Sequence, residues 1–444
     1  MNDFAKKLLE PLTRPDEETD FRIRTGTEMY RKGFCRLDLK AADGKPIQNA
    51  EVRVRQTGHA FLFGCNAFML GQFPEAEQNA KYEEVFASIF NEAVIPFYWS
   101  DLEPEDGELR FTSDSRPVYR RPPTDDVLAF CRRHNITPKG HPLCWHNFSP
   151  DWAPREPEAY MRRLDRRLRE IAARYAGEIQ IWDCVNEAQT RRPLRNRRAR
   201  TLPPPLPADH VERVFRMADR YFPDARLLYN DNRQWWDYEG DYSQVYLLVS
   251  RLLEHGCRVG GLGLQYHLFA KLLEHEAALF MDPRILYPML DQYAKLNIPV
   301  NFSEVSIIGR RDLGDGDRFQ ELAVERLYRI WFSHPAVDGI TWWNLVDGTA
   351  AYAPLGSEQG ENLLRAGLVN YDFTPKPAFR VLERLIREEW HTEKTVQYTD
   401  GGDNVFHGFY GDYEIEIRTD AGTFRQTFRF TRDMLMPIRI TLAN

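Results

Sequence analysis

Two glutamates in this 444-residue sequence follow apolar segments, where a charged side chain needs a chemical reason. Glu187 closes the segment IQIWDCVNE at residues 179–187, directly after Asn186, and Glu304 lies in IPVNFSEVS at residues 298–306. A pair of carboxyl groups can divide acid–base work if their surroundings keep one protonated and the other ionised. Such a pair can protonate the leaving oxygen of a glycosidic bond and attack its anomeric carbon. For either glutamate alone, a salt bridge at a strand end is the alternative.

Short apolar segments alternate with helix-like stretches through the middle of the chain. This alternation is typical of a (β/α)₈ TIM barrel, an α/β fold. The segments are almost continuously apolar, as expected of parallel strands that are covered on both faces. The eight expected strands lie at residues 61–66, 93–99, 137–145, 179–187, 225–232, 260–267, 298–306 and 339–347.

The ends of these expected strands carry most of the polar residues that could do chemistry. In a TIM barrel the carboxyl ends of the strands meet at one mouth, where active sites are built. Glu187 and Glu304 are therefore predicted to face each other across this mouth. Six strand ends contribute polar or aromatic side chains there: His141, Trp145, His146, Asn186, Glu187, Asn230, Asp231, Gln265, His267, Glu304, Trp342, Trp343, Asn344 and Asp347.

Segments rich in β-forming residues bracket the barrel. FCRLDLKAADGKPIQNAEVRVRQTGHAF alternates around an Asp-Gly turn, and DYEIEIRTDAGTFRQTFRF, followed by MPIRITL, reads as a hairpin and a further strand. Because chain termini often lie close together, we predict that residues 21–60 and 393–444 form one small accessory β-sandwich. Two separate decorations of the barrel are the alternative. Residues 1–20 are predicted to be a tail or short helix, and residues 61–392 to be the catalytic barrel.

The composition excludes several classes of function. A formal net charge of −7 opposes general binding to nucleic acid or to anionic membranes. No apolar stretch approaches the roughly 18 residues that a membrane span needs. The first residues lack an apolar signal core, so we expect a cytoplasmic protein as the sequence stands, or a secreted one if its signal is missing. The six cysteines show no CxxC pair, which indicates reduced thiols rather than disulfides or a zinc site.

The motifs at the strand ends resemble, in order, those of glycoside hydrolase family 10, the endo-β-1,4-xylanase family. The resemblance covers residues 60–390, and PKPA before the final helix also fits it. It implies a retaining glycoside hydrolase, xylanase-like, that needs neither a metal nor an organic cofactor. The motifs are GHPLCWHNFSPDW (140–152), WDCVNEA (182–188), LLYNDN (227–232), GLGLQYHL (261–268), NFSEVSI (301–307) and GITWWN (339–344).

The resemblance also implies roles for individual residues. Glu187 would be the general acid/base and Glu304 the nucleophile of a double displacement. Asn186 would hydrogen-bond the 2-hydroxyl of the sugar at the cleavage point, and Gln265 would help to position Glu187. The substrate would be β-1,4-linked xylan or its oligosaccharides, cut at internal bonds.

Further residues would support this chemistry or contact the substrate. His267, with Asp231 behind it, would keep Glu304 ionised and oriented. The residues expected to contact substrate are His141, Trp145, Asn230 and Trp343, together with Tyr98 and Trp99 from the segment described next.

Two segments depart from the family pattern. VIPFYW at residues 94–99 stands where the family has an ENEMKW-like segment that binds the next sugar, so Tyr98 and Trp99 are candidates to stack there. TAAYAP at residues 349–354 replaces a segment with a tryptophan that covers the cleft. Two alternatives therefore stay open: a β-glycosidase of the same family acting on glucans or short aryl or decorated glycosides, and a non-catalytic carbohydrate-binding barrel.

An arginine-rich segment follows the first glutamate. TRRPLRNRRAR at residues 190–200 contains six arginines. One interpretation is a solvated basic loop. The other is recognition of uronate branches, because a guanidinium can bind a carboxylate through two parallel hydrogen bonds. The solvated loop is favoured, because runs of like charge are usually solvated. The sequence carries no prediction of an oligomeric state.

Overall fold

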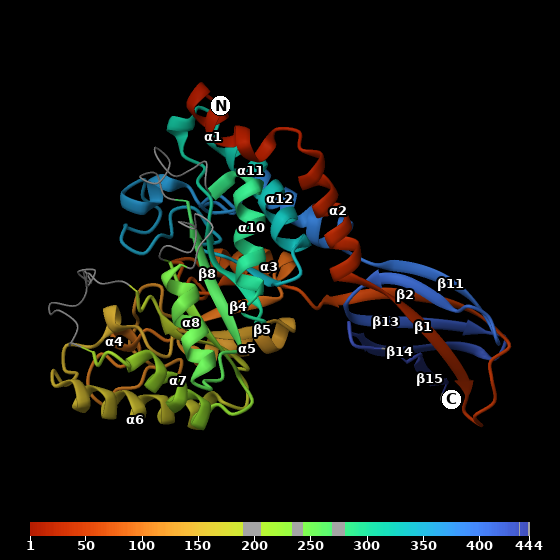
Figure 1. Cartoon of the computed structure of the whole chain (residues 1–444), viewed down its shortest axis with the longest axis horizontal. Coiled ribbons are helices and arrows are strands. Elements are labelled where there is room, and N and C mark those ends of the chain that lie inside the picture. Colours follow the sequence, from red (N-terminus) through yellow and green to blue (C-terminus); the bar gives the residue numbers. More distant parts are fainter. Residues whose placement is uncertain (190–205, 233–242, 269–279, 435, 443–444) are drawn as a thin grey trace.

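Eight parallel strands close into a barrel at the centre of the molecule. The computed structural model describes the chain except for residues 190–205, 233–242, 269–279, 435 and 443–444 (Figure 1). The last barrel strand pairs with the first, which closes the sheet and confirms the predicted TIM barrel. The strands are β3 (Leu62–Asn66), β4 (Glu92–Pro96), β5 (Thr137–His141), β6 (Ile181–Asn186), β7 (Arg226–Asp231), β8 (Gly261–His267), β9 (Val300–Ser306) and β10 (Val337–Trp342).

Amphipathic helices cover the outside of the barrel. In α6 the buried residues recur every three or four positions, and Pro157 begins the helix behind a capping Glu156. The larger helices are α3 (Ala76–Ile89), α5 (Thr124–His134), α6 (Pro157–Tyr175), α7 (His210–Tyr221), α8 (Gln244–Glu254), α10 (Pro283–Ala294), α11 (Gly316–Ser333) and α12 (Pro377–Arg384). Shorter elements are α4 (Trp99–Leu102), η1 (His146–Phe148), η2 (Arg311–Leu313), η3 (Gly360–Leu364) and η4 (Leu385–Glu389).

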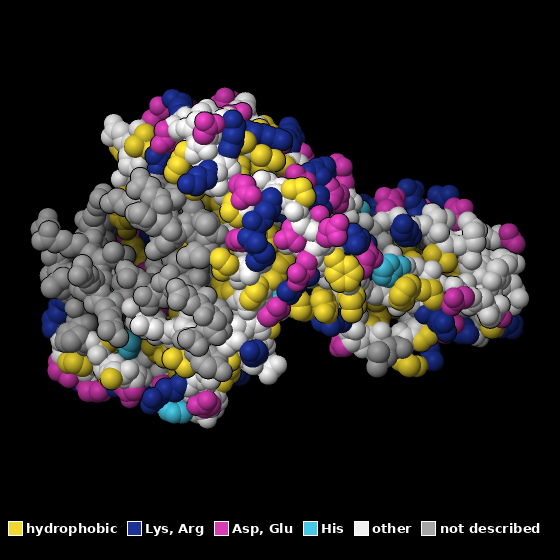
Figure 2. Space-filling view, turned by 45° about the horizontal axis from the view of Figure 1, so that its top comes forward, with side chains coloured by type: hydrophobic (Ala, Val, Ile, Leu, Met, Phe, Trp, Pro, Cys, Tyr) yellow, Lys and Arg dark blue, Asp and Glu magenta, His cyan; other side chains and the backbone are white. Residues whose placement is uncertain are grey.

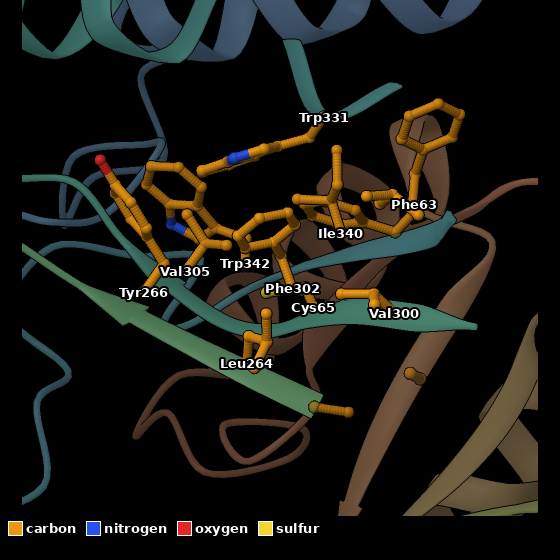
Figure 3. Packing of buried hydrophobic residues seen from close by; sticks show 14 of the residues in the cluster. Phe63, Cys65, Leu264, Tyr266, Val300, Phe302, Val305, Trp331, Ile340 and Trp342 are labelled. Atoms are coloured by element: carbon orange, nitrogen blue, oxygen red, sulfur yellow. The ribbon is translucent and has the colours of Figure 1, made fainter. Parts of the chain in front are cut away.

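The core between the barrel and α11 is built from aromatic rings (Figure 3). Phe302 of β9 stacks on Trp331 of α11 with ring centres 4.2 Å apart, and Tyr266 of β8 meets the same indole edge-on at 4.9 Å. Successive side chains of a strand point to opposite faces. Accordingly, Tyr266 packs outward, whereas the preceding residue of β8, Gln265, lines a cleft at the barrel mouth.

The N-terminal residues form two helices, α1 (Asp3–Thr13) and α2 (Glu17–Arg31), both in contact with α11. Asp16 caps α2 by accepting the backbone N–H groups of Glu18 and Thr19. Residues 21–31 are therefore helical, whereas we predicted that the β-rich segment begins at residue 21. The acidic first turn behind a capping aspartate was the available signal for this helix.

Strands from the two chain ends combine in two small sheets, which lie to one side of the barrel in Figure 1. The sheet orders are β12-β1-β15 and β11-β2-β13-β14. Residues Leu39, Val52, Val54, Ile415 and Ile417 form part of their shared core. The strands are β1 (Lys32–Ala41), β2 (Asn49–His59), β11 (Glu393–Thr399), β12 (Val405–Phe409), β13 (Gly411–Thr419), β14 (Gly422–Phe430) and β15 (Ile438–Leu442).

The described surface mixes both signs of charge. On the face shown in Figure 2, Lys and Arg alternate with Asp and Glu over the helices, so the described residues there form no continuous basic field. Arg22 pairs with Asp291, and Arg326 with Asp20. No described helix is long and apolar enough to cross a bilayer. All six cysteines are free and buried.

Candidate active site

A cleft opens at the carboxyl ends of the barrel strands. Of the predicted site residues, seven line it: Tyr98, Trp145, Glu187, Gln265, His267, Glu304 and Trp343. The other five, Trp99, His141, Asn186, Asn230 and Asp231, are buried behind or beside it. The two glutamates therefore share one cleft, on strands that are separated in the barrel by β7 and β8.

Glu304 is held from three directions. The side-chain nitrogen of Asn230 donates to its Oε1 at 2.9 Å, and Nε2 of His267 lies 3.2 Å from its Oε2. Nε2 of His141 lies 3.8 Å from Oε1. With only 5% of its surface exposed, this carboxyl group has a fixed orientation toward the cleft.

Glu187 is held by its backbone and by an amide. Its φ angle is +52°, a region that residues other than glycine rarely adopt. The N–H of Glu187 donates to the carbonyl of Asn230 at 2.8 Å, which helps to hold this conformation. Nε2 of Gln265 donates to Oε1 of Glu187 at 3.2 Å. Such local strain is concentrated at functional sites, where surrounding contacts over-determine it.

Asn230 joins the surroundings of the two glutamates into one network. Its Nδ2 donates both to Glu304 and to Oδ1 of Asn186, the latter at 2.8 Å, while its Oδ1 accepts from the hydroxyl of Ser303. Gln265 also donates to Oδ1 of Asn186, at 3.2 Å. We expected Asn230 to contact substrate. That expectation is wrong, because the residue is fully buried and both of its amide groups are already bonded to protein.

The side-chain Nδ2 of Asn186 has no hydrogen-bond partner among the described residues. The Oδ1 of the same amide accepts from Asn230 and Gln265, which fixes the amide orientation with Nδ2 buried. A buried donor without a partner is costly unless a ligand completes it. This geometry suits the predicted contact with a sugar hydroxyl, which stays a prediction.

Both carboxylate-bearing strands are irregular just before the glutamate. In β9, Phe302 and Val305 pair with alternate residues of β10, so β9 contains one extra residue at this point. In β6, the register against β7 shifts between Asp183 and Val185. A β-bulge breaks the alternation of a strand and re-aims the side chains beside it. In β9 it leaves both Ser303 and Glu304 facing the network around Asn230.

The prediction that Asp231 lies behind His267 is not what the structure shows. Nδ1 of His267 lies 3.0 Å from the hydroxyl of Ser306, its neighbour in the parallel register of β8 and β9. Asp231 instead accepts from the hydroxyl of Tyr229 and, at 2.8 Å, from the backbone N–H of Asn232. Strand register, which the sequence does not display, decided this pairing.

His141 belongs to a buried charged triad under the cleft. Its Nδ1 lies 2.8 Å from Asp183, whose other oxygen lies 3.2 Å from Nζ of Lys139. Burial alone would raise the pKa of Asp183, but the charge of Lys139 and the hydrogen bond with His141 together lower it below its ordinary value of 3.8. His141 is 1% exposed, and its Nε2 lies 3.8 Å from Glu304 beneath the cleft. Its contact with substrate stays a prediction.

Aromatic side chains wall the cleft. Trp145 and Trp343 line it, and Tyr98 packs against Trp145 and Phe148, with its ring centre 5.6 Å from that of Trp145 and 4.5 Å from that of Phe148. Flat aromatic faces such as these suit the apolar C–H faces of sugars.

The prediction that Trp99 contacts substrate is wrong. Its Nε1 donates to Glu103 at 2.8 Å, and its ring packs against Trp152 and Tyr160 beneath α6. The backbone turns into α4 at this point, which directs the adjacent side chains of Tyr98 and Trp99 to opposite sides.

Several residues that line the cleft were not predicted from the sequence. Arg120 and Arg121, from the connection between α4 and α5, line it together with Phe68 and Tyr352. Two adjacent arginines before two prolines were the available signal, but adjacent arginines in a loop are usually solvated. The arginine-rich segment at residues 190–200 lies outside the described residues, and both interpretations of it stay predictions.

Comparison with known proteins shows which family the chain resembles. The family model for glycosyl hydrolase family 10 matches residues 62–384. The chain is 26% identical to the anti-sigma-I factor RsgI6 of Acetivibrio thermocellus and 24% identical to endo-1,4-beta-xylanase 2 of Arabidopsis thaliana. These alignments cover 90% and 91% of this chain but 47% and 34% of the relatives, so the chain spans less than half of each.

One solved structure illustrates the shared fold. Xylanase 10B from Thermotoga petrophila, determined in complex with xylobiose, superposes with a TM-score of 0.57 at 22% identity. The match covers 74% of this chain and 95% of that one. At this identity the similarity establishes the barrel fold alone.

Proposed function

We propose that this chain, which belongs to glycosyl hydrolase family 10, is a retaining glycoside hydrolase that cleaves internal β-1,4-xylosidic bonds. One observation carries the proposal. Glu187 and Glu304 line a single cleft, and one network of side-chain amides orients both. Two relatives of this chain are named as endo-1,4-beta-xylanases, from Arabidopsis thaliana and Thermotoga neapolitana, which supports xylan as the substrate.

The first step forms a covalent intermediate. The carboxylate of Glu304 attacks the anomeric carbon as the bond to the leaving oxygen breaks, and the protonated carboxyl of Glu187 gives its proton to that oxygen. Nδ2 of Asn186 donates to the 2-hydroxyl, a hydrogen bond that strengthens in the transition state. Asn230 and His267 keep the Glu304 carboxylate aimed at the sugar.

The second step releases the sugar. Glu187, now ionised, takes a proton from a water molecule, and the resulting nucleophile displaces the carboxylate of Glu304 from the anomeric carbon. Two inversions at the same carbon give net retention. Gln265, at 3.2 Å from Oε1 of Glu187, keeps that carboxyl in place in both of its protonation states.

A product profile tests the proposal. The purified protein is incubated with xylan, glucuronoxylan, mixed-linkage glucan and an aryl β-xylobioside, and reducing ends, product lengths and the first-formed anomer are measured. We expect xylo-oligosaccharides of mixed length from xylan, with the β-anomer appearing first. Initial release of the α-anomer, or no reducing sugar from any of the four, would refute it.

Two alternative functions have specific support. The apolar surroundings of Tyr98 favour a β-glycosidase with a different neighbouring sugar, and preferential cleavage of the glucan or the aryl glycoside in the same panel would identify it. A non-catalytic barrel that binds carbohydrate is the second alternative, since one relative is named as an anti-sigma-I factor and not as a hydrolase. Binding of xylohexaose without turnover would identify that function.

A further inference from the structure

Arg120 is an unusual residue at the edge of the cleft. Its side chain lines the cleft, yet the residue is only 2% exposed. Its guanidinium donates to the carbonyl of Thr349, while its buried Nε has no hydrogen-bond partner. Among the residues that the structure describes, no carboxylate forms an ion pair with it, although Glu361 lines the same cleft.

A buried cation without a counter-ion is expensive. Burial lowers the pKa of Arg120, and the neighbouring charge of Arg121 lowers it further. A guanidinium stays charged in proteins, so it must be compensated by hydrogen bonds or by an anion. Here the protein supplies one carbonyl oxygen and the ring of Phe68, at 5.5 Å from the guanidinium carbon.

Arg120 also has a strained backbone. Its φ angle is +61°, which a side-chain-bearing residue rarely adopts. The segment is held in place by Arg110, whose buried guanidinium donates to the carbonyls of Asp101, Arg116 and Arg121 at 2.8, 2.8 and 3.0 Å. This buried scaffold fixes Arg120 before any ligand arrives, which lowers the entropic cost of binding.

Arg121 lies beside it but is already neutralised. Its Nε donates to Asp101 at 2.8 Å, and its guanidinium stacks over the ring of Tyr98 at 3.7 Å. The pair of arginines therefore has one counter-ion for two charges among the described residues. A ligand anion at this edge of the cleft would restore the balance.

The position of this excess charge indicates which part of a substrate would meet it. The ring of Tyr98 lies 5.5 Å from that of His141, and His141 lies 3.8 Å from Glu304. One aromatic ring and one imidazole thus separate the guanidinium of Arg121 from the carboxyl group at the cleavage point. A group bound there would belong to a neighbouring sugar and not to the sugar that is cleaved.

We propose that Arg120, with Arg121 beside it, recognises an anionic substituent, a carboxylate or a sulfate ester, on a sugar adjacent to the scissile bond. This inference rests on the proposed function and names the substrate class: an acidic rather than a neutral xylan-like chain. The planar guanidinium forms parallel hydrogen bonds with either anion. The two possible sources of the anion are distinguished by the substrates of the test.

The test compares three oligosaccharides of one backbone length: neutral, uronate-branched and sulfated. The wild-type protein should show kcat/KM about 10- to 100-fold higher on at least one acidic substrate, the range expected for charge-assisted hydrogen bonds. In Arg120→Gln the ratio of kcat/KM between acidic and neutral substrates should fall to about one. Equal values of kcat/KM for the wild type on all three would overturn the inference.

Arg116→Gln is the matched control, because it removes the same charge from the same segment. The Arg116 side chain is about half exposed and pairs with Glu108 outside the cleft, so this variant should retain the full acidic preference. Loss of the preference in Arg116→Gln as well as in Arg120→Gln would assign it to general charge and overturn the specific contact. If Arg120→Gln does not fold, the wild-type ratios decide the question.

The inference and the proposed function fail in different ways. If all three substrates are cleaved at equal rates, the inferred anion site is wrong, but the proposed hydrolase function still holds. If none is cleaved, the proposed function fails, and calorimetric binding of the same oligosaccharides still tests the anion site. Tighter binding of an acidic oligosaccharide that disappears in Arg120→Gln supports it, and equal binding of all three excludes it.

Discussion

Side-chain alternation is interrupted in the barrel strands that carry the glutamates and uninterrupted in the β13–β14 ladder of the small sheet. In the β13–β14 ladder every residue from Gly411 to Thr419 has a partner without interruption, and the residues of β13 from Gly411 to Ile417 alternate between core and surface. In β6 and β9 the register shifts immediately before Glu187 and Glu304. In a regular strand, side chains alternate between the core and the surface. A β-bulge interrupts this alternation, and in β6 and β9 it turns polar side chains toward the same cleft.

The largest effect should follow loss of either carboxylate at the barrel mouth. Glu304→Gln should lower kcat by a factor of about 10⁴ or more, because an amide cannot form the covalent intermediate. Glu187→Gln should impair substrates with poor leaving groups most, since it removes the proton donor. Rates are measured on a xylo-oligosaccharide and on an aryl glycoside with an activated leaving group.

These two variants have a clear control. Glu414 of β13 is also a strand carboxylate, but it pairs with Arg55 on the outer face of the small sheet. Glu414→Gln should leave kcat unchanged. Near wild-type rates in either barrel variant would show that Glu187 and Glu304 are not the catalytic pair.

The next largest effect concerns the charged triad beneath the cleft. Asp183→Asn should lower the free energy of unfolding at pH 7 by about 3–5 kcal/mol, because it leaves Lys139 buried without its counter-ion. Because the pKa of Asp183 is lowered in the folded chain, its stabilisation is present above the ordinary value of 3.8 and is lost as pH falls through the lower folded pKa. Denaturation curves between pH 7 and strongly acidic pH check both points. A variant with the same acid dependence as the wild type would contradict them.

A similar loss of stability in the small sheet should leave catalysis intact. Ile415→Ala removes a fully buried side chain from the shared core of the two sheets and should cost about 2–5 kcal/mol. Because the cleft is built from barrel residues, kcat/KM at low temperature should stay within about twofold. Unfolding curves and initial rates are measured on the same preparation. A large fall in kcat/KM would show that the sheets take part in the site.

The smallest expected effect follows removal of one hydroxyl group. We compare a hydroxyl in the β-bulge of β9 with a hydroxyl in the regular β13–β14 ladder. Ser303→Ala removes the hydroxyl that orients the amide of Asn230. It should lower kcat/KM roughly tenfold and the free energy of unfolding by about 1–3 kcal/mol, because a buried acceptor loses its donor. Thr427→Ala removes an exposed hydroxyl from the regular β13–β14 ladder and should change neither quantity. Equal kinetics of the two variants would mean that the bulge of β9 has no functional consequence.

Much of the fold and part of the site were predictable from the sequence. The eight barrel strands are apolar on both faces and end in turn or polar residues, so local composition was sufficient to find them. The helix over residues 21–31 was missed because its polar, β-branched composition resembles the alternation of the strand that follows. In the site, Tyr98 and Trp99 were predicted together, although one lines the cleft and the other supports α6.

The sequence by itself determined the barrel, the order of its strands and the two strand ends that carry Glu187 and Glu304, because hydrophobic period and motif order are local properties. Only the tertiary structure decided that Asn230 links the two glutamates, that Ser306 and not Asp231 lies behind His267, and that Arg120 reaches the cleft without a described counter-ion. These relations depend on register and on bulges between strands far apart in the chain. A one-residue shift, which leaves composition unchanged, turns a side chain to the opposite face.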